Sequence, residues 1–315
     1  MKIVNGVEEL EPRRRVVVLG TFDGVHLGHR RLIHEAIERA RELDAITTVA
    51  TFDPMPAEML RPGQVPRRLS GIERRAELIE QEGVDELLII AFTHELSLLS
   101  PEAFAEQVLV ARAGAVHVVV GENYRFGHAA GGDAATLTAL GQRLGFGVTA
   151  VKLVTADGER VSSSWIRELV RQGEVEHAAR LLGRAPWLDG TVVRGFARGR
   201  ALGVPTANLR WTPGRVVPAP GIYAGYGVLG PGDERYPAAI SVGGNPTFSD
   251  VEGTVVEAYL IGFEGDAYDR PMRVEFTRFL RHELAFETVE ELVEQMWRDI
   301  EKARALAEES EAEPI

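Results

Sequence analysis

The sequence contains no cysteine, which excludes disulfide bonds, thiolate catalysis and zinc–thiolate sites. Positive charge is also scarce, because 35 Lys and Arg residues stand against 47 Asp and Glu residues and give a net charge of −12. This balance argues against binding to nucleic acid or to an anionic membrane, since both need basic surface. No apolar run approaches the roughly 20 residues of a membrane span, and residues 1–15 are too polar for a signal peptide. We therefore expect a cytoplasmic protein without nucleic-acid or membrane partners.

Two nucleotide-binding patterns are absent as well. No Walker A sequence occurs, so any kinase chemistry here must be of a kind that does not use a P-loop. Residues 225–230 spell GxGxxG, but Pro231 follows and no helix begins there, so this run is not a dinucleotide-binding fingerprint.

The composition that remains, 45% hydrophobic and 26% charged over 315 residues, is that of a globular protein long enough for two domains. In the first half, short apolar runs alternate with amphipathic helical segments. The runs are residues 16–19, 46–52, 86–92, 116–120 and 148–153, and the helical segments are 30–43, 72–82, 101–113 and 133–144. This alternation predicts an α/β fold with a doubly wound parallel sheet, in which ligands bind beyond the carboxyl ends of the strands.

The second half has a different rhythm. Residues 162–182 continue as a helix, and Gly-Arg-Ala-Pro at 183–186 then breaks the pattern, so we predict domains 1–184 and 185–315. Beyond the break, short strands separated by Gly/Pro turns predict a small antiparallel β-barrel with a terminal helix over 288–307. The expected strands are 188–193, 222–229, 236–242, 255–261 and 272–279, and the acidic residues 308–315 are expected to fray.

The most informative motif is residues 20–29 (GTFDGVHLGH), between the first apolar run and the first helix. His26 and His29 are three apart, so a helix would place both imidazoles on one face, near a helix N-terminus that favours anions. Three glycines leave room for a phosphate to approach the backbone: Gly20, Gly24 and Gly28. Such a site suits attack on a nucleotide α-phosphate, with imidazoles stabilising the departing pyrophosphate. The alternative is a pair of histidines that merely caps a helix.

Phe22 and Asp23 complete this turn as candidate nucleotide-binding residues. Asp23 could orient either Mg²⁺ or a backbone amide, and the sequence leaves both possibilities open.

Two loops follow strands of the predicted sheet. Residues 51–56 (TFDPMP) form a loop shaped by prolines and contribute Phe52 and Pro54 as candidates. Residues 121–127 (GENYRFG) contain two aromatics beside an arginine, a combination that suits stacking on a planar ring, although an ordinary loop with aromatic anchors is the alternative. The candidates in this second loop are Asn123, Tyr124 and Phe126.

A run of serines and an arginine begins the helix predicted at 162–182. Ser163 and Ser164 are candidates for phosphate binding, but a serine at a helix start is also an ordinary N-cap. Arg167, one turn further on, can bind a polyphosphate with two parallel hydrogen bonds.

In the second half, a loop rich in glycine and arginine runs into Pro-Thr-Ala-Asn at 205–208. Backbone amides of such a loop can hold an anion, and arginines add charge for a polyphosphate, whereas the alternative is a basic surface loop. The candidates in this loop are Arg194, Gly195, Arg198, Gly199, Arg200 and Gly203. Thr206 and Asn208 alternate onto one side of an extended chain and offer the oxygen ligands that Mg²⁺ prefers.

Glu257 is the one charged residue in the apolar strand predicted at 255–261. A carboxylate in such a strand is costly to bury unless it is paired or used in chemistry, so Glu257 is a candidate general base. An exposed glutamate on an edge strand is the alternative.

These motifs resemble a known family of enzymes. Residues 20–29 are similar to the HxGH nucleotidyltransferases, and the runs at 51–56, 121–127 and 162–167 look like motifs of flavin adenylyltransferase modules. Pro-Thr-Ala-Asn, with residues 221–223 (GIY), 244–248 (GNPTF) and 281–283 (RHE), resembles riboflavin kinases. The resemblance, in this order of modules and over essentially the whole chain, is to bacterial bifunctional riboflavin kinase/FAD synthetases.

The resemblance implies two reactions. The C-terminal barrel would phosphorylate riboflavin with ATP to give FMN, with Glu257 as the base and Mg²⁺ held by Thr206 and Asn208. The N-terminal half would transfer AMP from ATP to FMN, giving FAD and pyrophosphate. His26, His29, Ser164 and Arg167 would stabilise the phosphates, and the flavin-binding residues would be Phe52, Pro54, Asn123, Tyr124, Phe126 and Arg281.

The N-terminal half also departs from the family pattern. The departures are Met55 for His, Asn123 for Asp, Ala130 where a basic residue is usual, and Ser164 for Thr. A riboflavin kinase with weak or lost FAD synthesis is therefore one alternative. A flavin-binding protein without turnover is a second, and transfer to another phosphorylated acceptor is a third. Oligomerisation is left open.

Overall fold

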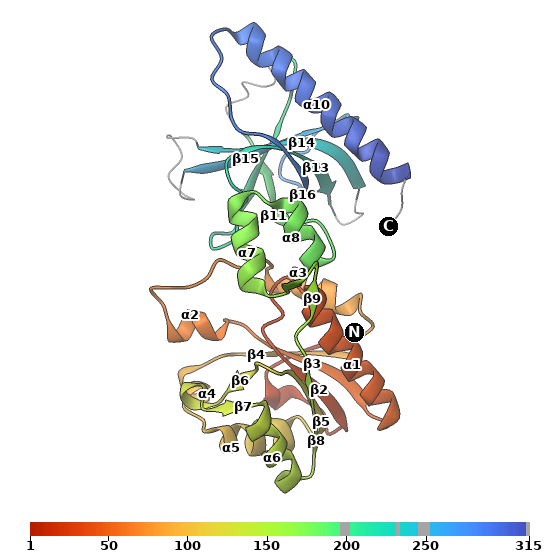
Figure 1. The fold of residues 1–315 in the computed structure, drawn as a ribbon, viewed down its shortest axis with the longest axis vertical. Helices are drawn as coiled ribbons and strands as arrows, with labels where there is room; N and C mark the ends of the chain where they lie inside the picture. The colour runs from red at the N-terminus through yellow and green to blue at the C-terminus, as the bar shows by residue number, and fades with distance from the viewer. Residues whose placement is uncertain (196–201, 231–233, 245–252, 313–315) are drawn as a thin grey trace. The chain divides into compact units, whose positions relative to one another are not determined.

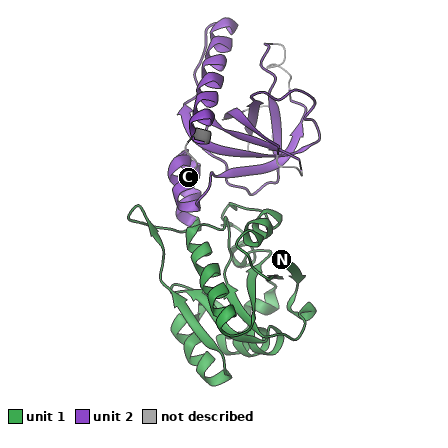
Figure 2. Cartoon of the chain, turned by 90° about the vertical axis from the view of Figure 1, so that its right-hand side faces the viewer, with its two compact units in different colours: residues 1–163 green, residues 164–315 purple. Residues whose placement is uncertain are grey.

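The computed structural model describes residues 1–195, 202–230, 234–244 and 253–312. The chain divides into two compact units, residues 1–163 and 164–315 (Figure 2). The predicted boundary after residue 184 differs from this division, because the helices α7 (Ser163–Gln172) and α8 (Val175–Leu182) fall almost entirely in the second unit. The reason is packing, since α8 lies against the barrel strand β16 (Pro271–Arg281) and Val175 belongs to the barrel core.

The first unit is built on a sheet in which every neighbouring pair of strands is parallel, as predicted. The strands, in spatial order, are β1 (Lys2–Asn5), β4 (Glu86–Ile90), β3 (Ile46–Phe52), β2 (Arg15–Leu19), β5 (Ala115–Gly121) and β8 (Gly147–Val151). All residues of β2 are buried because helices cover both faces of the sheet. The edge strand β1 was not predicted.

Helices cover the sheet on both sides, which confirms the doubly wound architecture (Figure 1). On one face α1 (Leu27–Glu42) lies against β2, β3 and β5. On the other, residues of α5 (Pro101–Phe104), of the π-helix η2 (Ala105–Arg112) and of α6 (Ala134–Leu144) pack in one core with alternate strand residues. The other elements of this unit are η1 (Val7–Glu9), α2 (Pro56–Leu60), α3 (Ile72–Glu80), α4 (His94–Ser97), η3 (His128–Ala130) and the short ribbons β6 (Arg125–Phe126) with β7 (Gly132–Asp133) and β9 (Thr155–Ala156) with β10 (Glu159–Arg160).

The order of the strands locates the ligand site of this unit. From β2 the chain continues to β3 on one side, and β5 lies on the other, so the winding direction reverses between β2 and β5. Ligands of such sheets bind in the crevice at this switch point, outside the carboxyl ends of the strands. The segments that leave β2 and β5 there are residues 20–26 and 122–124.

The second unit contains a closed antiparallel barrel, as predicted. Its strands, in spatial order, are β11 (Trp187–Val193), β12 (Ala207–Trp211), β15 (Thr254–Leu260), β14 (Glu234–Gly244), β13 (Gly221–Leu229) and β16. The sequence predicted all of these strands except β12, which begins within the Pro-Thr-Ala-Asn motif.

Two helical predictions for this half need correction. The helix expected over 162–182 is broken into α7 and α8 at Gly173, whose φ of 84° lies in the left-handed region. The terminal helix α10 (Val289–Ala312) extends past residue 307, so residues 308–312 are helical and not frayed. Within the described part of the chain, no helix combines the length and apolarity needed to cross a membrane.

Candidate active sites

The two histidines of the first motif stack directly on each other. His26 is the N-cap of α1, and its Nδ1 accepts the backbone N–H of His29 at 3.2 Å. The two rings lie 3.6 Å apart between centroids at an angle of 13°. Because Nδ1 of His26 is an acceptor, its Nε2 carries the ring proton and is a donor for an anionic oxygen. The geometry thus brings the paired imidazoles together at the switch point of the sheet.

The glycines of this turn permit close contacts with the aromatic rings. A Cβ at Gly28 would lie 3.1 Å from Cε1 of His26, and a Cβ at Gly20 would lie 3.0 Å from the ring of Phe22. Gly24 has a φ of 82°, and Phe22 and Val25 also have positive φ values, 49° and 42°. Left-handed backbone is unusual for Phe and strained for Val, so other contacts must hold the turn in this shape.

Asp23 provides those contacts. Its carboxylate is fully buried and accepts the N–H groups of Leu69 at 3.0 Å and Ser70 at 2.9 Å, together with the Ser70 hydroxyl at 3.2 Å. The hydroxyl of Ser70 in turn accepts the N–H of Gly24 at 2.9 Å, and Ser163 Oγ donates to the Asp23 carbonyl at 3.0 Å. Of the two roles left open for Asp23, this geometry favours orienting backbone amides over binding Mg²⁺.

Two kinds of contact fix the loop after β3: aromatic packing of Phe52 and an ion pair of Asp53. Phe52 is 7% exposed and makes an edge-on contact with Phe92 at 5.7 Å between centroids. The Asp53–Pro54 peptide bond is cis, and Asp53 accepts a hydrogen bond from Arg68 Nη1 at 2.9 Å. Met55, the departure from the family pattern, is the N-cap of α2 and is 3% exposed, so its side chain is packed inside the protein.

The loop after β5 contains one aromatic residue that belongs to the core. Phe126 is 6% exposed and stacks on Tyr124 with 5.9 Å between ring centroids. Burial raises the pKa of the Tyr124 hydroxyl. Asn123 Oδ1 lies so close to Gly121 that a Cβ there would be 3.1 Å away. For Phe126, the geometry favours the aromatic-anchor alternative over ligand stacking.

Ser164 and Arg167 lie on α7, where Arg167 Nη1 donates to Ser164 Oγ at 3.4 Å. Their predicted part in adenylyl transfer stays a prediction.

Glu257 lies on the outer surface of the barrel. Its neighbours Val256 and Ala258 belong to the barrel core, so strand alternation directs Glu257 outward. In the register of the barrel it pairs with Asn208 on β12 and with Ser241 on β14. Thr206 Oγ1 donates to Glu257 Oε2 at 3.0 Å. The predicted base and one predicted metal ligand are therefore in direct contact.

A cavity of about 220 Å³ lies between this face of the barrel and α10. Its lining includes the polar residues Thr206, Ser241 and Glu257, and Phe286, Leu292 and Met296 contribute apolar side chains. A mostly apolar pocket with a few polar groups is typical of a site for a small organic ligand.

Arg281, a predicted flavin-binding residue, lines this pocket but is engaged with α10. Its Nε and Nη2 donate to the carboxylate of Asp299 at 3.0 and 2.6 Å, and Asp299 also accepts from Gln295 at 3.0 Å. This bidentate pair fixes α10 to the end of β16 and so sets the position of one pocket wall.

The loop predicted to bind phosphates is described only at its ends. The guanidinium of Arg194 lies over the ring of Tyr268, 4.8 Å from its centroid. A Cβ at Gly195 would come within 2.5 Å of the Asn208 amide, so the glycine allows the loop to cross close to that side chain. Gly203 has a φ of 79°. Arg198, Gly199 and Arg200 lie outside the described residues.

The donor set beside the pocket fits a magnesium ion. Thr206 offers a hydroxyl and Asn208 an amide oxygen, both beside the Glu257 carboxylate, and hard oxygen ligands of this kind suit Mg²⁺. In the ranges that the structure describes, no group of three or more His, Cys, Asp or Glu side chains could hold a metal.

Comparison with known proteins assigns both units. The family model for FAD synthetase matches residues 8–165, and the model for riboflavin kinase matches residues 182–307. The bifunctional riboflavin kinase/FMN adenylyltransferase of Pseudomonas fluorescens is 37% identical over 310 residues, 98% of either chain. The chain belongs to this family. The Listeria monocytogenes enzyme of the same name is also 37% identical and is covered, like this chain, over 92% of its length.

A solved structure shares the fold of this family member. A crystal structure titled as a macrolide-efflux protein from Streptococcus pneumoniae has a TM-score of 0.87 and 29% sequence identity, with 96% of this chain and 99% of that chain covered. The resemblance inferred from the motifs is thus confirmed.

Some residues of the two sites were not predicted from the sequence. Ser70 belongs to none of the motifs and carries no pattern of its own. Asp299 did leave a signal, because it follows Leu292 and Met296 on the same face of α10, where a carboxylate among apolar residues requires a partner.

Proposed function

We propose that this enzyme makes FMN in its barrel and FAD in its parallel-sheet domain. In the first reaction riboflavin and ATP give FMN and ADP, and in the second FMN and ATP give FAD and pyrophosphate. For the kinase reaction, the observation that carries the proposal is the contact of Thr206 with Glu257 in the lining of the pocket. For adenylyl transfer, it is the stacked pair His26 and His29 at the switch point of the sheet.

In the kinase reaction, Glu257 takes the proton of the riboflavin 5′-hydroxyl as its oxygen attacks the γ-phosphorus of ATP, and ADP leaves. The hydroxyl of Thr206 donates to Glu257 Oε2 and so orients the carboxylate for this proton transfer. When bound, Mg²⁺ would offset phosphate charge, and Thr206 and Asn208 would hold it. The loop of residues 194–203 would supply amides and arginines to the phosphates.

In the adenylyl transfer, an FMN phosphate oxygen attacks the α-phosphorus of ATP and pyrophosphate leaves. FMN already carries the nucleophile, so positioning and electrostatic stabilisation do most of the work. His26 Nε2–H and His29 are the donors to the departing charge, with the glycine-rich turn against the α-phosphate. From the sequence, Ser164 and Arg167 would add charge and hydroxyl contacts.

We propose residues 1–184 and 185–315 as the two functional halves, a cytoplasmic location, Mg²⁺ as the metal, and no nucleic-acid partner.

The decisive experiment is a time course with riboflavin, ATP and Mg²⁺ that resolves riboflavin, FMN and FAD by chromatography. For wild type, FMN should appear first and then give way to FAD. Glu257→Gln should abolish FMN formation while FAD formation from supplied FMN continues. Glu234→Gln, the same change at an exposed ion pair on β14, is the matched control and should keep both activities.

Each alternative gives a different result in this assay. Accumulation of FMN without FAD would show that the protein is a riboflavin kinase, and that the altered N-terminal loops no longer support adenylyl transfer. Riboflavin that stays unchanged would favour a flavin-binding protein without turnover. Near-normal kinase turnover in Glu257→Gln would remove Glu257 as the base.

A further inference from the structure

We propose that residues 68–70 fix the glycine-rich turn (residues 20–28) and the loop after β3 (residues 51–56) in position relative to each other. Arg68 and Ser70 are then positioning residues for FAD synthesis. The inference rests on the proposed function of the first unit. Neither residue belongs to the motifs that identify the site, and neither is predicted to touch a substrate.

One end of this segment is bound to the glycine-rich turn. The N–H groups of Leu69 and Ser70 both donate to the Asp23 carboxylate, and the Ser70 hydroxyl bridges Asp23 and Gly24 by donating to one and accepting from the other. Asp23 and Ser70 are fully buried, and Leu69 is 4% exposed. Hydrogen bonds to a buried carboxylate are strong and costly to break, so this end of the segment cannot shift without moving the turn.

The other end of the segment is bound to the loop after β3. The Arg68 guanidinium donates from Nε to Glu58 at 2.6 Å and from Nη1 to Asp53 at 2.9 Å. Asp53 precedes Pro54, and Glu58 lies on α2, so one planar group fixes both sides of the predicted flavin loop. The side chain of Arg68 is only 21% exposed, which shields these ion pairs from solvent.

Adjacent residues of one segment therefore connect both loops. A second contact joins the same loops directly, because Thr51 Oγ1 donates to the Thr21 carbonyl at 3.0 Å. The strained backbone of Phe22 and Val25 shows that the turn needs external support, and Asp23 with Ser70 supplies it. Since the reaction depends on alignment of two substrates, a misplacement of about 1 Å in either loop can cost about 100-fold in rate.

The test uses full-length Ser70→Ala and Arg68→Ala, with Ser97→Ala and Arg39→Ala as controls that make the same changes at partly exposed helix positions. FAD synthesis from supplied FMN gives kcat and the KM for each substrate. The kinase activity of the second unit corrects for enzyme concentration, and calorimetric unfolding of the first unit checks that each variant is folded at the assay temperature. We expect kcat/KM for FAD synthesis to fall at least about tenfold in both variants, while kinase turnover and both controls stay near wild type.

Two further readouts separate positioning from simple loss of stability. Ser70→Ala should act mainly on kcat and the KM for ATP, and Arg68→Ala mainly on the KM for FMN. Added guanidinium at low, non-denaturing concentration should restore FAD synthesis to Arg68→Ala, since the ion can enter this partly exposed site, and should leave Ser70→Ala unchanged. FAD synthesis close to wild type in both folded variants would overturn the inference.

Failure of the proposed function is distinguishable from failure of this inference. If wild type makes no FAD, the proposed function of the first unit is wrong. The inference is then decided by calorimetric binding of ATP and of FMN. Binding weakened at least about tenfold in the two variants supports it, and unchanged binding refutes it.

Discussion

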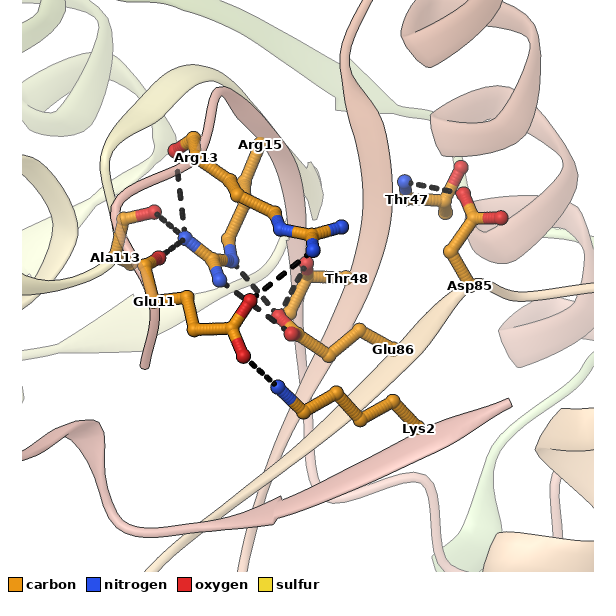
Figure 3. A network of polar contacts seen from close by, with 9 residues as sticks. All are labelled: Lys2, Glu11, Arg13, Arg15, Thr47, Thr48, Asp85, Glu86 and Ala113. Carbon is orange, nitrogen blue, oxygen red and sulfur yellow. Dashed lines mark hydrogen bonds and ion pairs between the residues drawn. The ribbon is translucent and has the colours of Figure 1, made fainter. Parts of the chain in front are cut away.

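A buried ion pair lies at the amino ends of the strands of the parallel sheet, away from the candidate site. Breaking it offers a test in which the first unit unfolds while the second unit keeps its activity. Arg15 and Glu86 begin β2 and β4, with side chains 0% and 4% exposed (Figure 3). Arg15 Nε donates to Glu86 at 2.7 Å, and its Nη1 donates to the carbonyls of Glu11 at 2.9 Å and Ala113 at 3.1 Å. Thr48 Oγ1 completes the network by donating to Glu86 at 3.1 Å.

We predict that Arg15→Met destabilises the first unit by about 3–5 kcal/mol, because it leaves the Glu86 carboxylate buried without its counter-charge. For a unit of this length that corresponds to a loss of about 6–20 °C in melting temperature. The double variant Arg15→Met/Glu86→Leu should recover part of the loss, since an apolar pair replaces a buried unpaired charge. It should not recover all of it, because the carbonyls of Glu11 and Ala113 still lack their donor.

The assay follows thermal inactivation of FAD synthesis and of riboflavin phosphorylation in the same samples, beside calorimetry. FAD synthesis should be lost at a lower temperature in Arg15→Met, with the kinase curve unchanged. Arg39→Met, which removes an arginine from an exposed ion pair, should stay within about 0.5 kcal/mol of wild type. The reasoning fails if Arg15→Met is as mild as this control, or if the double variant is less stable than the single one.

Two other predictions concern the first unit. Gly28→Ala should lower kcat for FAD synthesis about tenfold or more, because the new Cβ lies 3.1 Å from the His26 ring and displaces it, and kinase turnover should not change. Gly63→Ala, where an added Cβ meets nothing within 4 Å, is the control, and equal kcat values for the two variants would contradict the argument. Burial lowers the pKa of His117 below its ordinary value of 6.5, so the unfolded chain binds this proton more readily than the native one. Stability should therefore fall as pH drops below about 6.5, and His117→Gln, measured by denaturant unfolding at pH values above and below that point, should flatten the dependence. A slope identical to that of wild type would show that His117 does not contribute.

The parallel sheet was predictable because its central strands are continuous apolar runs between amphipathic segments. The edge strand β1 was not, since only Val4 of its residues is buried and four residues carry no period. The break between α7 and α8 was missed for a different reason. The helical pattern continues across Gly173, but a Cβ there would lie 2.9 Å from the hydroxyl of Tyr223, a constraint that only the folded barrel supplies.

Among the site residues, too, those fixed by local patterns were predictable and those fixed by long-range contacts were not. Motifs placed His26 and His29 at the end of β2, and alternation placed Thr206 and Asn208 on one side of the chain, because these relations are local. The partners of Asp23 lie 46 and 47 residues away in sequence. The residues next to Asp23 in the sequence do not indicate that its carboxylate accepts hydrogen bonds from these backbone amides. Long-range contacts of this kind decide whether a motif residue touches substrate or supports one that does.

Glu257 illustrates how far a local pattern can be taken. Its apolar neighbours suggested a carboxylate buried in a strand and therefore costly, which is correct in part. The barrel avoids the cost of burying this carboxylate, because side chains alternate between the two faces of the strand. Val256 and Ala258 fill the core, while Glu257 faces a pocket that α10 lines on the opposite side. That wall is held by Arg281 at the end of β16 and by Asp299 on α10. The shape of the pocket beside Glu257 therefore depends on an ion pair between residues 18 apart in sequence, and only Arg281 belongs to a sequence motif. A candidate base can be picked from the pattern of its strand, but the pocket that it faces forms only where the helix after the barrel packs against the barrel strands.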